Sequence, residues 1–336
     1  MSPIGNDRTV LSKDERFSAM LRKLVMPILL VVLVVFFSFT SDGTFFTWYN
    51  IKNMLSQSSY VIIAAVGLTA VMLAGGIDLS IGYQMSLTGI SCGMLLVNSG
   101  MSDWAVVVLT LFIGILLGLF NGIVCVKLGV FPLIITLSTS MIFQGISYMV
   151  SGSKTYLGFS EAFLFIGQGF IGPIPFNIFL AAAMVAIAAF ILHKTYFGRY
   201  VYAIGGNEEA AKLSGIDTDR IKIILYAFCG LCSAIASIVL ISRSGAAAST
   251  IGPGTEFTAL SGAILGGVTL AGGEGSVVGM VIGAFIITIL GNGMQLMRLG
   301  TFPQYVAKGV VLIAAMAFDA YQKRRKEVGK RGGDAG

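Results

Sequence analysis

Residues His193 to Lys222 read HKTYFGRYVYAIGGNEEAAKLSGIDTDRIK and form the most polar internal segment of the chain. Strongly apolar sequence lies on both sides of this loop. Within it, a glycine pair precedes a run from Asn207 to Leu213 that is long enough for about two helical turns. A compact, charged loop between apolar stretches indicates a surface on one membrane face where the chain touches a soluble partner.

The composition is that of a membrane protein. Of the 336 residues, 56% are hydrophobic and only 11% are charged, whereas soluble domains carry about 25% charged residues. The 43 glycines are typical of transmembrane helices that pack closely through small side chains. The four cysteines lie in apolar runs, and the pair Cys229 and Cys232 has no second pair or histidine nearby, so we interpret them as buried apolar residues rather than metal ligands.

Apolar stretches of about 17–25 residues, the length needed to cross a bilayer, follow one another along the chain. The sequence therefore predicts an all-α polytopic protein. The ten expected spans lie near residues 24–40, 54–75, 79–98, 104–126, 132–150, 176–192, 223–242, 256–271, 276–297 and 303–320.

The basic residues predict the orientation of these spans. Most of the 22 Lys and Arg residues fall in segment 1–23, at Lys127, in loop 193–222 and in the tail after residue 320. The positive-inside rule then places these segments and both termini in the cytoplasm. The expected organisation is a cytoplasmic segment 1–23, a membrane domain 24–320 that carries the loop 193–222, and a basic cytoplasmic tail 321–336.

An internal repeat accompanies this topology. Residues Asn121 to Pro132 read NGIVCVKLGVFP, and residues Asn292 to Pro303 read NGMQLMRLGTFP. The first copy joins the fourth and fifth spans and the second joins the ninth and tenth, which predicts inverted repeats of spans 2–5 and 7–10. The sequence LAGG also occurs twice, at Leu73–Gly76 and Leu270–Gly273, but with a different offset; we interpret these copies as recurring small-residue turns.

The turn AGGIDLSIG, Ala74 to Gly82, contains a carboxylate in apolar surroundings. Because a charge there is costly unless it is paired or hydrated, Asp78 is a candidate functional residue, together with Ser80. The alternative is that Asp78 caps the helix that follows. Glu274, in the turn AGGEGS, has the same two interpretations.

Polar uncharged residues recur within the expected spans. They could line a pathway for a neutral, hydrogen-bonding solute, or they could form hydrogen bonds between helices. Lys308, inside the last expected span, is interpreted as reaching toward the membrane interface. The further pathway candidates are Gln57, Ser58, Asn121, Thr136, Ser138, Gln144, Asn292 and Gln295.

Several enzyme classes are excluded by residue content. The single histidine, His193, allows neither a Ser-His site nor a His-rich metal site. The segment GSKT, Gly152 to Thr155, lacks the GxxxxGK spacing of a phosphate-binding loop. We therefore expect no metal or cofactor on this chain, and any ATP would have to be bound by another chain.

The motif E-A-A-x-x-x-G occurs in the charged loop, at Glu209, Ala210, Ala211 and Gly215. It resembles the cytoplasmic loop of ABC importer permeases, whose short coupling helix docks into a groove on the ATPase subunit; the I-x-L-P tail often seen after it is missing here. On this resemblance the coupling residues are Gly205, Gly206, Asn207, Glu208, Glu209, Ala210, Ala211 and Gly215.

Three longer stretches extend the resemblance over residues from about 45 to 320. They are GRYVYAIGGNEEAAKLSGI, GGIDLSIG and LSGAILGGVTLAGGEGSVVGMVIGAFI. Together they resemble permease subunits of carbohydrate ABC importers of the ribose-transporter family.

The resemblance implies a permease of the bacterial inner membrane that is not itself an enzyme. Its implied partners are ATPase subunits that bind ATP and Mg²⁺, a periplasmic or lipid-anchored sugar-binding protein, and a second permease copy, identical or paralogous; nucleic acid is not among them. The implied solute is ribose or a similar monosaccharide, since relatives for xylose, fructose, galactose or a furanosyl signalling molecule share these motifs. The alternative is an ion-coupled secondary transporter, but Asp78, Glu256, Glu274 and Asp319 all lie at expected span ends.

Overall fold

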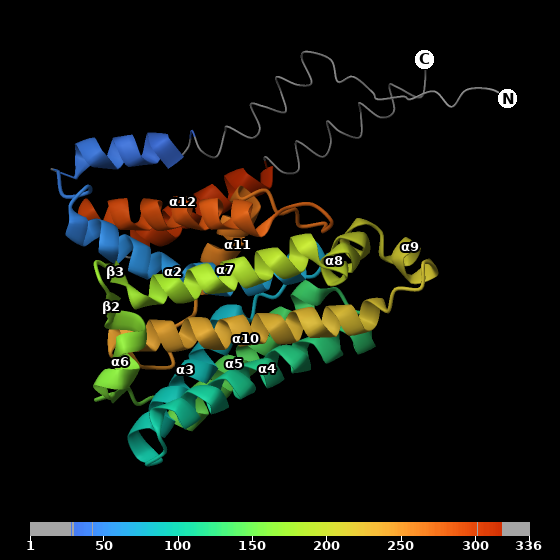
Figure 1. The fold of residues 1–336 in the computed structure, drawn as a ribbon, viewed down its shortest axis with the longest axis horizontal. Helices are drawn as coiled ribbons and strands as arrows, with labels where there is room; N and C mark the ends of the chain where they lie inside the picture. Colours follow the sequence, from blue (N-terminus) through green and yellow to red (C-terminus); the bar gives the residue numbers. More distant parts are fainter. Residues whose placement is uncertain (1–27, 29, 42, 301, 318–336) are drawn as a thin grey trace.

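The computed structural model describes residues 28, 30–41, 43–300 and 302–317, which form a bundle of long helices with roughly aligned axes (Figure 1). The expected terminal segments 1–23 and 321–336 lie outside the described residues. The helices are α2 (Trp48–Leu73), α3 (Ile81–Asn98), α4 (Asp103–Leu128), α5 (Pro132–Ser151), α6 (Glu161–Gln168), α7 (Phe176–Lys194), α8 (Tyr196–Gly206), α9 (Glu208–Leu213), α10 (Thr218–Ser244), α11 (Thr255–Leu265) and α12 (Val277–Leu296).

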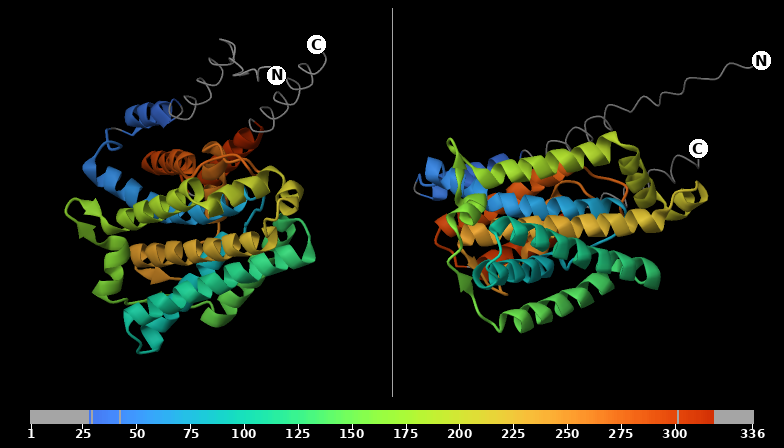
Figure 2. Two further views of the ribbon diagram at one scale, coloured as in Figure 1. Left: turned by 45° about the vertical axis from the view of Figure 1, so that its right-hand side comes forward. Right: turned by 60° about the horizontal axis from the view of Figure 1, so that its bottom comes forward.

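Four two-residue strands complete the fold. They are β1 (Tyr156–Leu157), β2 (Phe170–Ile171), β3 (Ile174–Pro175) and β4 (Ala246–Ala247). β1 pairs with β4 and β2 pairs with β3, both antiparallel. The strands β2 and β3 lie with α6 at one end of the bundle, and α9 lies at the other end (Figures 1 and 2).

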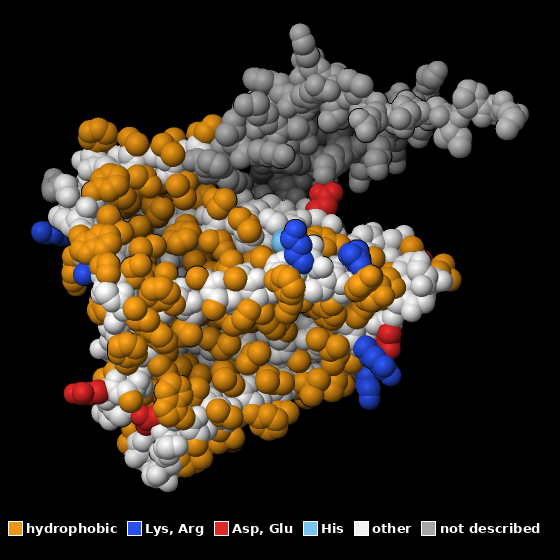
Figure 3. All heavy atoms as spheres, viewed as in Figure 1, with side chains coloured by type: hydrophobic (Ala, Val, Ile, Leu, Met, Phe, Trp, Pro, Cys, Tyr) orange, Lys and Arg blue, Asp and Glu red, His pale blue; other side chains and the backbone are white. Residues whose placement is uncertain are grey.

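Six helices are long and apolar enough to cross a membrane: α2, α4, α5, α7, α10 and α12. The other four expected spans contain α3, α11 and two shorter apolar helices, Leu30–Thr40 and Phe302–Ala317. The all-α membrane fold is thus confirmed, whereas ten spans with cytoplasmic termini remain a prediction. Hydrophobic side chains cover the visible flank of the bundle, and charged side chains gather mostly toward its ends (Figure 3).

The centre of the bundle is the contact of α10 with α2 and α4. The α4 glycines Gly114, Gly118 and Gly122 recur every four residues and so share one face of that helix. A Cβ atom on Gly118 would lie 2.1 Å from the carbonyl oxygen of Tyr226, and one on Gly230 would lie 2.1 Å from that of Gly114. Glycine therefore lets the backbones of α4 and α10 touch, as in closely packed transmembrane helices.

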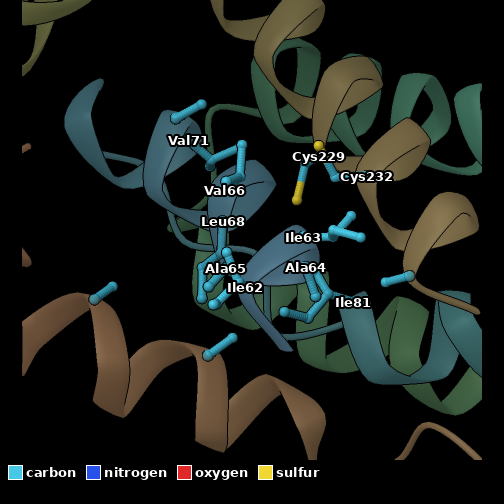
Figure 4. Close-up of a cluster of buried hydrophobic side chains, with 14 of the residues drawn as sticks. Ile62, Ile63, Ala64, Ala65, Val66, Leu68, Val71, Ile81, Cys229 and Cys232 are labelled. Carbon is cyan, nitrogen blue, oxygen red and sulfur yellow. The ribbon is translucent and has the colours of Figure 1, made fainter. Parts of the chain in front are cut away.

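Cys229 and Cys232 face α2 from the other side of α10. Figure 4 shows them beside Ile63 and Val66 of α2 in a cluster of buried apolar side chains. Both cysteines are fully buried and free, as are Cys92 and Cys125. This agrees with their interpretation as small apolar residues.

Helices α3 and α11 begin inside the protein. A Cβ atom on Gly82, in the first turn of α3, would lie 1.9 Å from Oε2 of Glu256, in the first turn of α11. Glu256 is only 2% exposed. The expected span 256–271 is too long, because α11 ends at Leu265 before two glycines, of which Gly267 has φ +84°.

Candidate functional site

Helix α9 is a short helix with a cap at each end. Asn207 precedes it in extended conformation, and its side chain accepts a 3.0 Å hydrogen bond from the Ala210 N–H. At the other end Gly215 has φ +82°, and its N–H donates to the Lys212 carbonyl at 3.0 Å while the Ile216 N–H donates to that of Ala211 at 3.1 Å. This is the Schellman arrangement, which favours glycine at that position. The motif glycine thus has a local role: it ends α9.

The two faces of α9 differ in exposure. Ala211 is only 4% exposed and packs into the main apolar core. Glu209 and Ala210 are exposed, and Leu213 is 91% exposed. Leu213 was not among the sequence candidates, although an apolar residue within an exposed polar run is a signal of a contact surface.

Glu208 attaches α9 to α10. Its carboxylate forms an ion pair with Lys212 at 3.0 Å and a second with Lys222 of α10. Partial burial would raise the pKa of Glu208, but the hydrogen bonds from Lys222 and Lys212 outweigh burial and hold that pKa below its ordinary value of 4.5. The same carboxylate raises the pKa of Lys212. The base of α9 is therefore held by charge as well as by Ala211.

The two LAGG turns meet each other beneath α8. The Gly273 N–H donates a 2.9 Å hydrogen bond to the Leu73 carbonyl. Gly205, in the last turn of α8, fills the same junction: a Cβ atom on it would lie 2.0 Å from the Leu73 oxygen and 2.3 Å from the Gly273 nitrogen. A Cβ atom on Gly272 would lie 2.6 Å from the Gly75 nitrogen. These recurring small-residue turns thus form one contact between distant parts of the chain.

A cavity of about 690 Å³ opens beside this junction. Its lining includes the glycine pairs Gly75-Gly76 and Gly205-Gly206 and the charged side chains of Glu208, Lys212 and Lys222. The α4–α5 connection, residues 129–131, closes another side together with Pro132 at the start of α5. Four of the expected coupling residues, Gly205, Gly206, Asn207 and Glu208, thus border a space within the α9 end of the bundle.

Asp78 is fully buried in a hydrogen-bond network. Its carboxylate accepts bonds from the Ser80 N–H at 2.9 Å, the Ser80 hydroxyl at 2.6 Å and the Gln84 amide at 3.0 Å. Asn121 Nδ2 donates to Ser80 Oγ at 2.7 Å and approaches both Asp78 oxygens at 3.4 Å. Thr136 joins the same turn, since its hydroxyl accepts from the Leu79 N–H at 3.3 Å.

The structure corrects the cap interpretations of both acidic turns. Ser80, not Asp78, occupies the cap position of α3. In the second turn Ser276 caps α12 and accepts a 3.0 Å hydrogen bond from the Gly279 N–H, so Glu274 is not the cap. The sequence missed Gln84, a fully buried side chain one helical turn after Ser80.

Two further candidates bind other segments away from Asp78. Asn292 and Asn50 exchange a pair of side-chain hydrogen bonds at 2.9 and 3.0 Å. Gln144 donates to the Ser249 carbonyl at 3.1 Å. These contacts match the expectation of hydrogen bonds between segments rather than a shared pathway.

The remaining pathway candidates do not line one common space. Ser58 and Ser138 bond to carbonyl oxygens of their own helices, at 2.7 and 2.8 Å. Ser138 and Gln295 are exposed. Gln57 is the exception, because it lines a second, polar cavity.

Comparison with known proteins identifies the family. The family model described as "Branched-chain amino acid transport system / permease component" matches residues 50–316. The ribose import permease protein of Escherichia coli (strain K12) is 37% identical over 296 residues, which cover 87% of this chain and 92% of that protein. The ribose import permease protein of Bacillus subtilis (strain 168) is 37% identical over 310 residues, covering 91% and 95%.

A third relative carries a different sugar in its name. The xylose transport system permease protein of Haemophilus influenzae is 31% identical over 369 residues, covering 92% of this chain and 98% of that protein. No solved structure matches the chain. The family match, the full-length relatives and the apolar helices agree: the chain belongs to the branched-chain amino acid transport system / permease component family and is a multi-pass inner-membrane permease subunit of an ABC importer.

Proposed function

We propose that this chain is the membrane-spanning subunit of an ATP-driven sugar importer, and that its solute is ribose or a similar monosaccharide. Similarity to permeases named for ribose and for xylose supports a sugar as the solute class. In the proposed complex an extracytoplasmic binding protein delivers the sugar and sets its selectivity. The permease then needs only weak contacts with the solute, because tight binding would slow release.

The observation that carries the proposal is the doubly capped, exposed helix α9. It presents Glu209, Ala210 and Leu213 at one end of the bundle (Figure 1). A short helix with an exposed apolar residue fits a groove on another protein, the helix-in-groove mode of recognition. We assign that groove to an ATPase subunit that binds ATP and Mg²⁺.

Two routes would carry motion from α9 into the bundle. Glu208 is paired with Lys222, so a displaced α9 would pull on α10. Gly205 lies against Leu73 and Gly273, so the attached α8 would push on α2 and on the segment before α12. Closure of an ATPase pair on two permease copies, identical or paralogous, would thereby rock helices that border the pathway.

The proposed orientation places α9 in the cytoplasm and gives ten spans. Lys194, at the end of α7, lies in the same expected inner segment as α9, and Lys127, at the end of α4, lies in another expected inner segment. An excess of basic residues marks the cytoplasmic side of membrane proteins.

Reconstitution tests the proposal directly. The permease, its ATPase and the binding protein are placed in proteoliposomes, and uptake of ribose, xylose, galactose and fructose is measured with ATP hydrolysis. Glu209→Lys and Gly215→Glu should abolish uptake while the protein stays in the membrane. Intact uptake in both variants would overturn the coupling role of α9.

A second measurement separates this function from ion-coupled transport. Dissipating the proton gradient with an ionophore, while ATP is maintained, should leave the initial rate of sugar uptake unchanged. Loss of uptake under that condition would favour the secondary transporter.

A further inference from the structure

A polar cavity of about 140 Å³ lies in the part of the bundle away from α9. Gln57 of α2 borders it, and Leu73, where α2 meets Gly205, lies about 24 Å further along that helix at 1.5 Å per residue. Helices α2, α11, α12 and Phe302–Ala317 each contribute to the lining. The polar side chains among the lining residues include those of Gln57, Tyr60, Thr258, Thr288, Gln304 and Lys308.

Lys308 directs its ammonium group toward the protein interior. Its Nζ donates to the hydroxyl of Thr258, on the first turns of α11, at 3.5 Å. Among the residues that the structure describes, no carboxylate lies within ion-pair distance of this ammonium. The ammonium thus faces this cavity, whereas the sequence interpretation had it reach toward the membrane interface. A charge held inside a membrane span is costly, and its retention marks a functional site.

Gln57 is also incompletely satisfied. Its side chain lines the cavity and forms no hydrogen bond with any other described residue. The Thr258 hydroxyl donates to the Gly254 carbonyl at 3.2 Å and so presents its lone pairs toward Lys308. Gln57 and Lys308 are both only partly buried, so their hydrogen-bonding groups are open to a ligand that enters the cavity. Donors and acceptors that converge on one small cavity without full pairing therefore point to a ligand with several hydroxyl groups.

We propose that this cavity is an intramembrane contact site for a neutral, polyhydroxylated solute, with Lys308 and Gln57 as its main hydrogen-bonding groups. The ammonium donates to hydroxyl oxygens of the solute, and the Gln57 amide both donates and accepts. The other polar groups of the lining are uncharged hydroxyls and amides, which can exchange hydrogen bonds with several hydroxyl groups of one ligand. The inference rests on the proposed function, because it assigns a contact site along the same import route.

The first test compares two lysines in the reconstituted complex. Lys308→Met keeps the apolar stem and removes the donor, whereas Lys52→Met changes a lysine that lies over the Trp48 and Phe170 rings at 5.8 and 5.2 Å. The measurement uses the sugar of the four-sugar panel that the wild-type complex imports best. Lys308→Met should lower the amount of this sugar imported per ATP hydrolysed by roughly tenfold or more, because one charge-assisted hydrogen bond to the sugar is lost. Lys52→Met should keep the wild-type ratio, and Lys308→Arg should restore part of it.

A second pair of variants keeps the proposal testable if Lys308→Met folds poorly. Gln57→Leu should also lower the ratio of sugar to ATP, whereas Gln295→Leu, at an exposed glutamine outside the cavity, should not. A wild-type ratio in both Lys308→Met and Gln57→Leu would overturn the proposal. A parallel fall in uptake and ATP hydrolysis would do so too, because it indicates a structural role. If the wild-type complex imports none of the sugars, the proposed function itself fails.

Discussion

The backbone N–H of Gly273 donates a 2.9 Å hydrogen bond to the carbonyl oxygen of Leu73. This bond joins the two copies of Leu-Ala-Gly-Gly, one at the end of α2 and the other before α12. Gly205 packs against both atoms, so the helix that leads into α9 rests on this contact. A displacement of α9 therefore reaches two distant parts of the chain through one junction.

Gly205→Ala should impair transport, whereas Gly206→Ala should not. A methyl group on Gly205 would lie 2.0 Å from the Leu73 oxygen, but one on Gly206 has nothing within 4 Å. Overpacking of this kind costs about 1–3 kcal/mol. Sugar uptake and the melting temperature of the purified variants check the pair. Equal behaviour of the two alanine variants would show that the junction is not tight.

Leu213→Ser should weaken the complex with the ATPase subunit. Leu213 is 91% exposed in the isolated chain, and burial of a leucine side chain at an interface contributes roughly 1.5–3 kcal/mol. We expect at least about a tenfold loss of affinity in a pull-down or light-scattering titration.

The matched control for Leu213 is Leu157→Ser. Leu157 is 62% exposed and lies in β1, outside the α9 loop. It should leave ATPase binding unchanged. An unaltered affinity of the Leu213 variant would remove this residue from the interface.

The attachment of α9 to α10 should depend on pH through Glu208. Because its pKa in the folded protein lies below 4.5, its ion pairs stabilise the loop above that pH, and the stabilisation is lost as the pH falls through the folded-state value. Glu208→Gln should expose residues 205–216 to severalfold faster hydrogen exchange at pH 7.

Acidification of the wild-type protein through the folded-state pKa of Glu208, which lies below 4.5, should reproduce the effect of Glu208→Gln on that loop. Glu209→Gln is the control, since Glu209 is the adjacent exposed glutamate. Equal exchange rates in both variants at pH 7 would show that the Glu208 ion pairs do not hold the helix.

Asp78→Ala should destabilise the folded protein severely. The substitution leaves the buried donors of Ser80, Gln84 and Asn121 without their shared acceptor. Each unsatisfied buried group costs about 1–3 kcal/mol, so we expect a fall in melting temperature of roughly 5–10 °C.

Asp78→Asn keeps one oxygen and should lose less stability than Asp78→Ala. Asp219→Ala, at an exposed position, should have a free energy of unfolding within about 0.5 kcal/mol of the wild-type value. Thermal unfolding in detergent compares the three variants. A small effect of Asp78→Ala would show that the network contributes little to stability.

Local features of the sequence were sufficient to predict the class of fold and the position of α9. Apolar stretches of membrane-spanning length predicted the helices, because the bilayer constrains each stretch separately. The predicted helical run Asn207 to Leu213 contains α9, and the structure adds that Asn207 and Gly215 bound it through cap interactions between residues only a few positions apart. The family resemblance rested on the same local motifs.

Contacts between distant segments could not be predicted in this way. The meeting of the two LAGG turns, the joining of Asn121 and Thr136 to the Asp78 turn, and the inward direction of Lys308 each depend on which helices pack together. The rotation of a helix decides which of its polar side chains face a neighbour, and amino-acid order alone does not give that rotation.

The sequence by itself therefore determined a polytopic helical membrane protein with a short helix in a charged loop, because hydropathy and helix formation depend on residues within one span or a few turns. The tertiary structure alone decided that Gly205, Leu73 and Gly273 touch and that Lys308 and Gln57 share a cavity. Those relationships arise from close packing of helices, in which a missing Cβ atom sets how near two backbones can approach.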